Sequence, residues 1–152
     1  MLDNCKSARE RWGGVSNIID RWLQERQDLL VRYCGLSGLT DADTQALRLP
    51  QLCQLMVDYI SAGHFEIFEK LVSEGQEFDD QAGLEASKSL FQKIQMTTDS
   101  ILDFNDKYQE TDDLETLKPD LSHLGEALEM RFELEDRIIE LLHVSHKDQI
   151  AN

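Results

Sequence analysis

The chain has 152 residues, of which 30 are acidic and 15 basic, and its formal net charge at pH 7 is −15. With 41% hydrophobic residues, a chain of this length can bury a core and is typical of one domain. The negative field disfavours direct binding to nucleic acid or anionic lipid and favours a basic protein surface, although solubility alone also explains it.

Cysteine usage and hydropathy indicate the compartment. Cys5, Cys34 and Cys53 are odd in number and widely spaced, so neither a disulfide framework nor a zinc site is indicated. No window contains the roughly 18 uninterrupted apolar residues of a membrane span. The first residues also lack the order of charges and apolar residues of a signal peptide. We therefore expect a cytoplasmic protein that does not bind membranes.

The N-terminal part predicts two helices. Residues 7–12 are expected to form a short helix that stops at Gly13 and Gly14. A second helix is expected from Val15 to about Gly35, and Arg26 falls within its apolar stripe. The other members of that stripe are Val15, Ile18, Ile19, Trp22, Leu29, Leu30 and Tyr33.

A third, organising helix is predicted from about Leu47 to Val72. The preceding segment 35–41 is expected to be a loop, in which Thr40 or Asp41 could cap the next helical segment. Pro50 is compatible with a first helical turn or with a short lead-in helix, so the organising helix could begin in earnest only there. Apolar residues at steps of three and four form its core face, namely Leu52, Met56, Tyr59, Gly63, Ile67 and Leu71.

The opposite side of this helix is a candidate docking surface. It carries one large aromatic residue among small ones, bordered by carboxylates, as a surface that receives another helix would need. A single outward Phe is also common without any function. The residues of this side are Gln51, Gln54, Asp58, Ser61, Ala62, Phe65 and Glu69.

Two further helices complete the chain. A polar connection is expected from Glu74 to Gly83, followed by a helix over about 84–108. The last helical region is expected to begin weakly at Leu114, to be interrupted or redirected at Pro119, and to continue over 120–146. Strand-like alternation and solenoid repeats are not found in the sequence.

Four long amphipathic helices predict an all-α fold, an antiparallel four-helix bundle with a short additional N-terminal helix. The whole chain, residues 1–152, is expected to be a single domain with a core over about 7–146.

The last helix carries charges on two faces. Arg131 and Glu135 lie on or beside its apolar stripe, four residues apart, and could pair with each other. A second face collects Glu126, Glu129, Glu133, Asp136 and Glu140. This acidic face is either simply solvated or an electrostatic landing surface for a basic helix.

Catalytic and metal-binding patterns are incomplete. A carboxylate-bridged metal bundle needs Glu-x-x-His on two helices, and only Glu140 to His143 matches. His64 is expected at the rim of the bundle, and His143 and His146 in a fraying last turn. Phosphate-binding loops and nucleophile elbows are not found. The sequence therefore favours a protein without catalytic residues, metal or cofactor.

Three ordered blocks of sequence resemble the regulator of sigma D family, the Rsd/AlgQ anti-sigma factors of gamma-proteobacteria. The resemblance extends over about residues 1–146, and residues 10–15 and 61–69 look closer to the AlgQ branch than to the enteric Rsd branch. The blocks are Asp20-Arg21-Trp22-Leu23, Val57 to Phe65, and Gly125 to Asp136.

This resemblance implies a non-enzymatic regulator that binds the C-terminal region of the primary sigma factor. That region is a basic helix-turn-helix module that reads the −35 promoter element and contacts the polymerase flap. Its sequestration, a stationary-phase role, would free polymerase for alternative sigma factors. The alternative from a different class is an acidic signalling adaptor that binds a metabolic or phosphotransfer protein.

The resemblance and the helical pattern together give candidate contact residues. Asp58 is expected to pair with an arginine of the partner, Phe65 to anchor it, and Glu69 to act as a rim charge. Trp22, Arg131, Phe132 and Glu135 are expected to be structural. The remaining candidates for partner binding are Ser61, Ala62, Asp20, Arg21, His64 and Glu126.

Overall fold

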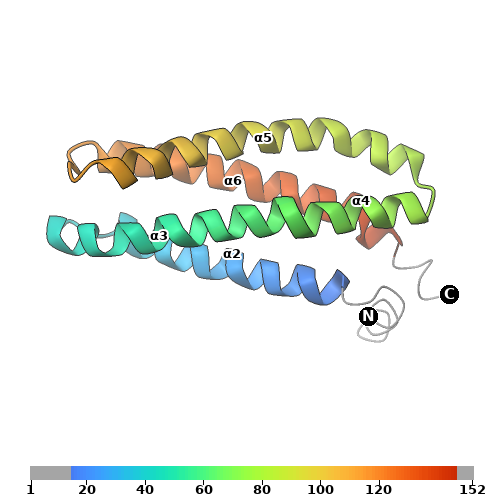
Figure 1. The fold of residues 1–152 in the computed structure, drawn as a ribbon, viewed down its shortest axis with the longest axis horizontal. Helices are drawn as coiled ribbons and strands as arrows, with labels where there is room; N and C mark the ends of the chain where they lie inside the picture. The colour runs from blue at the N-terminus through green and yellow to red at the C-terminus, as the bar shows by residue number, and fades with distance from the viewer. Residues whose placement is uncertain (1–14, 147–152) are drawn as a thin grey trace.

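Four long helical rods run alternately up and down along one axis (Figure 1). The computed structural model describes residues 15–146, so the short helix expected over 7–12 lies outside the described residues. That part of the chain contains no strand, which confirms the all-α antiparallel bundle. Its elements are α2 (Val15–Ser37), α3 (Ala42–Ala62), the π-helix η1 (Gly63–Ile67), α4 (Phe68–Glu77), α5 (Gln81–Glu110), α6 (Leu117–Leu142) and the 3-10 turn η2 (Val144–His146).

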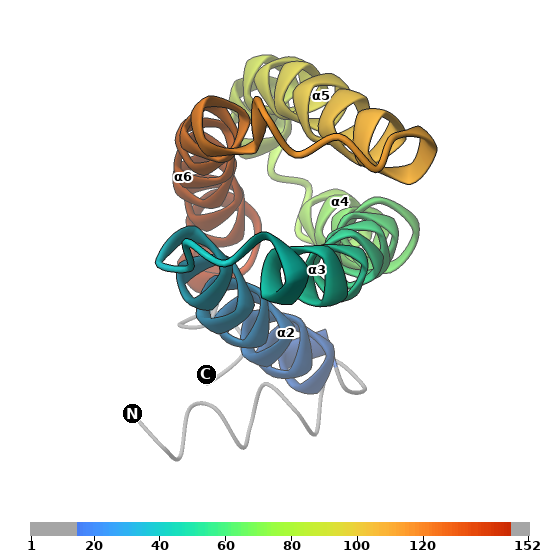
Figure 2. The same ribbon diagram turned by 90° about the vertical axis from the view of Figure 1, so that its left-hand side faces the viewer.

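The helices enclose one apolar core. Viewed along the axis, α3 and α6 lie diagonally opposite, with α2 and α5 between them (Figure 2). α2 packs mainly on α3, and α5 mainly on α6, while α4 contacts both α5 and α6. No helix among residues 15–146 is long and apolar enough to cross a membrane.

The organising helix begins earlier than the sequence predicted. The Asp41 carboxylate accepts hydrogen bonds from the backbone N–H and the hydroxyl of Thr44, so α3 starts at Ala42. Pro50 lies inside α3 and does not start it. Because Pro50 and Ala46 are both exposed, water can bond the carbonyl that the proline leaves without a donor. The expected start at Pro50 is therefore wrong.

The connection between α4 and α5 is also shorter than expected. Only Phe78, Asp79 and Asp80 separate the two helices, and Glu74 lies within α4. Asp79 has a positive φ of 52°, which reverses the chain. The Asp80 carboxylate then caps α5 by accepting from the backbone N–H of Gly83 at 2.9 Å.

Pro119 does not interrupt the last helix. α6 starts at Leu117, so Pro119 stands in the first turn, where a backbone N–H has no helical partner in any case. The predicted break at Pro119 is therefore wrong, because the helix begins two residues before the proline instead of ending there.

His143 is part of the core and not of a fraying turn. Its Nδ1 lies 2.8 Å from a carboxylate oxygen of Glu74, and both side chains are almost fully buried. The contact fixes the end of α6 against α4. The expectation of a frayed turn is wrong for His143, and the side chain of His146 lies outside the described part of the structure.

An aromatic cluster joins α2 to the organising helix. The Trp22 ring stacks on Tyr59 at a centroid distance of 4.8 Å and meets Phe68 edge-on at 5.8 Å. A Cβ atom at Gly63 would lie 2.8 Å from Cζ2 of Trp22. Only glycine therefore lets the backbone approach this buried ring.

A charged network is buried beside the aromatic cluster. Arg131 donates to Glu135 at 2.9 Å, and Arg26 donates to the same carboxylate at 3.0 Å. The Tyr59 hydroxyl also donates to Glu135. Burial raises the pKa of Tyr59, so the phenol keeps its proton at neutral pH. Burial likewise raises the pKa of Glu135, and Arg131, Tyr59 and Arg26 oppose that shift. The expectation that Arg131 and Glu135 pair is confirmed.

At the other end of the bundle, a polar lock closes the α5–α6 connection. Asp120 accepts from the Lys107 ammonium at 2.6 Å and from the Tyr108 hydroxyl. These two donors hold the pKa of Asp120 below its ordinary value of 3.8.

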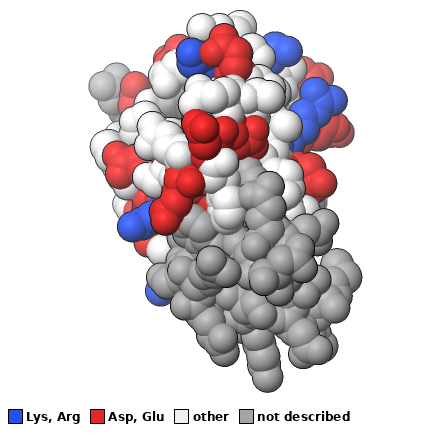
Figure 3. All heavy atoms as spheres, turned by 90° about the vertical axis from the view of Figure 1, so that its right-hand side faces the viewer, with Lys and Arg blue, Asp and Glu red and all other residues white. Residues whose placement is uncertain are grey.

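Carboxylates dominate elsewhere on the surface. Figure 3 shows that Asp and Glu side chains predominate at the end near the α4–α5 turn.

The close approach at Gly63 predicts opposite effects for two glycine substitutions. Gly63→Ala should lower the free energy of unfolding by about 1–3 kcal/mol, because the added Cβ would overlap the buried Trp22 ring. Gly35→Ala should raise it by about 0.5–1 kcal/mol, because Gly35 is helical and its nearest neighbour would lie 3.6 Å away. Urea unfolding followed by circular dichroism measures both. A gain of stability in both variants would contradict the proposed contact.

The lock at Asp120 predicts a pH-dependent contribution to stability. The folded-state pKa lies below the unfolded value, so the contribution is present above about pH 4 and is lost as the pH falls through the folded pKa. Asp120→Asn should therefore be less stable than the parent protein at pH 7. The difference should shrink towards zero as the pH falls below 3.8 and through the folded-state pKa. Thermal unfolding of both proteins between pH 2.5 and 7 tests this, and a constant difference would refute it.

Candidate docking surface

A π-helical turn interrupts the organising helix at residues 63–67. The backbone N–H of Phe68 bonds to the carbonyl of Gly63, five residues earlier. Such a turn inserts one extra residue into the helix and is often found at functional sites. Three consecutive residues, His64, Phe65 and Glu66, are consequently exposed.

Trp22 supports this turn from α2. Its indole N–H donates to the Tyr59 carbonyl at 3.0 Å, and the ring lies against Gly63. The Tyr59 carbonyl also accepts from the backbone N–H of Gly63, the first residue of the π turn. It therefore has a side-chain donor in addition to its helical one. This arrangement and the burial of its side chain confirm that Trp22 is structural, and they place its ring against the first residue of the π turn.

Asp58, Ser61, Ala62, Phe65 and Glu69 form what we call the docking strip. Phe65 is 69% exposed, Asp58 and Glu69 are exposed, and Ser61 and Ala62 are half-buried. The Phe65 ring meets His64 edge-on at 4.9 Å. Asp58 accepts from the side chain of Gln54, one turn earlier, at 2.9 Å. The strip thus combines one large exposed apolar side chain with two small half-buried residues.

A group of carboxylates borders the strip on the side of α2. We call Glu25, Asp58 and Glu66 the acidic cluster. Burial raises the pKa of Glu25, and the negative charges of Asp58 and Glu66 raise it further, while Arg21 opposes them. Within the described residues, Oε2 of Glu25 is buried without a hydrogen-bond partner. A cationic group supplied from outside would relieve both conditions.

The structure brings some of the predicted residues together and separates others. Arg21 on α2 faces the acidic cluster, since its charge acts on Glu25, and His64 adjoins Phe65. Asp20 is exposed on α2. Glu25 and Glu66 were not predicted. Two features of the sequence could have indicated them: Glu25 lies four residues after Arg21 on one helix, and Glu66 follows Phe65 directly.

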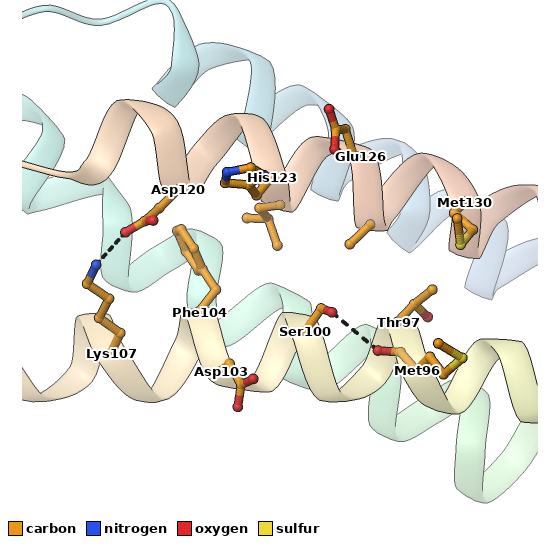
Figure 4. A pocket seen from close by; sticks show the side chains of 12 residues that line it. Met96, Thr97, Ser100, Asp103, Phe104, Lys107, Asp120, His123, Glu126 and Met130 are labelled. Carbon is orange, nitrogen blue, oxygen red and sulfur yellow. Dashed lines mark hydrogen bonds and ion pairs between the residues drawn. The ribbon is translucent and has the colours of Figure 1, made fainter.

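Glu126 belongs to a different surface. It lines a groove of about 510 Å³ between α5 and α6, together with Asp103, Met96 and Met130 (Figure 4). The two methionines are 70% and 56% exposed. α6 lies diagonally across the bundle from α3, so Glu126 does not extend the docking strip.

The reactive side chains do not assemble into a centre. Among residues 15–146, no group of three or more His, Cys, Asp or Glu side chains is arranged to hold a metal ion. Glu140 is exposed while His143 is buried against Glu74, so the single Glu-x-x-His match does not converge. Burial raises the pKa of the Cys53 thiol to about 11, which leaves it protonated and unreactive.

Comparison with known proteins gives one consistent result. The family described as "Regulator of RNA polymerase sigma(70) subunit, Rsd/AlgQ" matches residues 1–143. The chain is 36% identical to the regulator of sigma D of Enterobacter sp. (strain 638), covering 99% of this chain and 98% of that protein. It is 34% identical to the regulator of sigma D of Shigella dysenteriae serotype 1 (strain Sd197), covering 93% and 94%.

A third regulator of sigma D, from Salmonella arizonae, is 35% identical over 93% of this chain and 91% of its own length. These matches favour sigma regulation over the signalling-adaptor alternative, whereas the preference for the AlgQ branch stays a prediction. The blocks that contain Trp22, Asp58, Phe65 and Arg131 all fall within the matched region. The chain therefore belongs to the Rsd/AlgQ family of regulators of the sigma(70) subunit of RNA polymerase.

Proposed function

We propose that this protein binds the C-terminal region of the primary sigma factor through the docking strip and the acidic cluster, as a non-enzymatic anti-sigma factor. Family membership supports sigma as the target. The surface itself supports the location, because a module that meets DNA phosphates presents a basic face. Such a face complements a protein with a net charge of −15.

One observation carries the proposal. Glu25, Asp58 and Glu66 come from two helices to one place beside an exposed Phe65, and within the described residues a carboxylate oxygen of Glu25 lacks a partner. Three neighbouring negative charges repel one another in the free protein. An arginine of the partner could donate to Asp58 and Glu25 together and remove that repulsion.

The members of the strip have different roles in this complex. Phe65 supplies an apolar anchor that loses contact with water when a helix packs on Ser61 and Ala62. Asp58 pairs with the arginine at the centre of the contact. Glu69 stands at the rim, where a charge changes the association rate more than the residence time.

Occupation of this region of sigma would prevent its contacts with the −35 promoter element and with the polymerase flap, as the family resemblance implies. Transcription that depends on the primary sigma factor would fall, and polymerase would become available to alternative sigma factors. Calorimetric titration with the isolated C-terminal region of the primary sigma factor tests this directly. We expect a 1:1 complex of micromolar or tighter affinity that weakens with salt.

Asp58→Ala should weaken sigma binding by at least about tenfold, because it removes a charge from the centre of the contact. The matched control is Asp99→Ala. Asp99 is also an exposed helical aspartate that accepts from a glutamine four residues earlier, but it lies on α5. The control should stay within about twofold of the parent protein. Equal losses in both variants would mean that only overall charge matters and would refute the assignment of Asp58.

Glu25→Gln should stabilise the free protein and weaken its complex. The folded-state pKa of Glu25 lies above its ordinary value, so the carboxylate costs stability at neutral pH and not below its unfolded pKa. The gain in melting temperature should therefore appear at pH 7 and vanish near pH 3. Sigma affinity should fall at least about threefold. Unchanged affinity together with the gain in stability would exclude Glu25 from the interface.

A further inference from the structure

A cleft of about 590 Å³ opens between the α4 end of the organising helix and α5. Its walls are mainly apolar, from Phe68, Val72, Phe91 and Ile94, and Arg131 lies at its base. Two exposed side chains line its mouth: Glu69, which belongs to the docking strip, and His64, which is the neighbour of Phe65. The cleft is nevertheless separate from the acidic cluster, which faces α2.

Arg131 has hydrogen-bonding capacity that the protein does not use. Its Nε donates to Glu135 at 2.9 Å, and its Nη1 donates to the Thr98 hydroxyl at 2.6 Å and the Thr97 hydroxyl at 3.3 Å. The carbonyl of Ile94 lies 3.5 Å from the same Nη1. No described residue accepts from Nη2. A guanidinium has five N–H donors, so two of them remain for a group in the cleft.

The burial of Arg131 limits which groups can accept from these two donors. The residue is only 1% exposed, and an unpaired buried donor loses its hydration without compensation. Arg131 nevertheless lines the cleft, so part of its guanidinium borders open space.

We propose that this cleft binds a small molecule with one carboxylate on a flat apolar body, the carboxylate accepting from Nη2 of Arg131 and the body lying against the packed pair Phe68 and Phe91, whose rings meet edge-on at a centroid distance of 5.3 Å. The cavity volume lies in the range of small-molecule sites, and its chemistry, apolar walls with a few convergent polar groups, is typical of them.

The surrounding charges select a singly charged ligand. Glu135 already pairs with Arg131, and Glu69 stands at the mouth. A doubly charged phosphate would face both of these acidic residues, whereas one carboxylate matches the donors that remain. The side chain of a partner protein is a poorer fit, because 1% exposure leaves Arg131 accessible only from within the cleft.

The test uses 2-naphthoate and its neutral analogue 2-naphthamide as probes, titrated into the full chain and followed by amide and arginine side-chain NMR shifts. We expect 2-naphthoate to bind at least about tenfold more tightly than 2-naphthamide. The shifts should concentrate on α4, α5 and the Arg131 Nε–H. Equal affinities, or no binding of 2-naphthoate at millimolar concentration, would overturn the proposal.

Arg131→Gln would break a buried ion pair and could prevent folding, so the matched variants fill the cleft instead. Ser73 is exposed and lines the cleft, while Ser89 is an exposed helical serine away from it. Ser73→Trp should weaken 2-naphthoate binding at least about tenfold, and Ser89→Trp should leave it within about twofold. Retained affinity in Ser73→Trp would place the probe elsewhere and refute the site.

Discussion

The docking strip depends on the contact between the Trp22 ring and the backbone at Gly63. The ring occupies the space where any other residue would place its Cβ, and its N–H supplies a second donor to the Tyr59 carbonyl. Both features favour a widened turn at this point. Because a π turn adds one residue, Phe68 enters the core while Phe65 stays in solvent only three positions earlier. The strip and the cleft thus share one structural cause.

The sequence pattern carried a signal of this turn that periodicity alone did not resolve. The core positions Tyr59, Gly63, Ile67 and Leu71 advance by three successive steps of four. On a regular helix a step of four residues rotates the side chain by about 40° beyond a full turn. After three such steps, Leu71 would therefore point about 120° away from the direction of Tyr59. The extra residue in the π turn reduces this rotation by about 100°, so that Ile67 and Leu71 point into the core. The bundle and its strip were therefore predictable from local pattern, but the exact phase of Glu69 relative to Asp58 was not.

The two prolines were misplaced for local reasons, whereas the charged residues that sequence reasoning misplaced or missed depend on partners distant in the chain. His143 is buried because it meets Glu74, 69 positions earlier, and no local rule indicates that pair. Burial in the folded bundle raises the pKa of Glu25 first, and Asp58 on α3 and Glu66 on η1 raise it further, whereas on its own helix Arg21 lowers it and Asp28 raises it. By contrast, Arg131 and Glu135 were placed correctly because their spacing on one helix already brings them together. Local pattern thus predicts elements and intrahelical pairs, whereas burial of single charges needs the tertiary fold.

The two surfaces differ in charge, and the buried network contributes to the cleft through Arg131. Glu135 lies between two guanidinium groups, with Arg26 reaching out to Asp136 at the surface and Arg131 reaching towards the cleft. The outward side of the organising helix presents the exposed carboxylates of Asp58 and Glu66, while the cleft has Arg131 at its base. A net charge of −15 conceals this separation, because it is summed over the whole chain. A basic helix on the strip and an anion in the cleft would consequently be attracted by different groups, with Glu69 and His64 as the side chains adjacent to both.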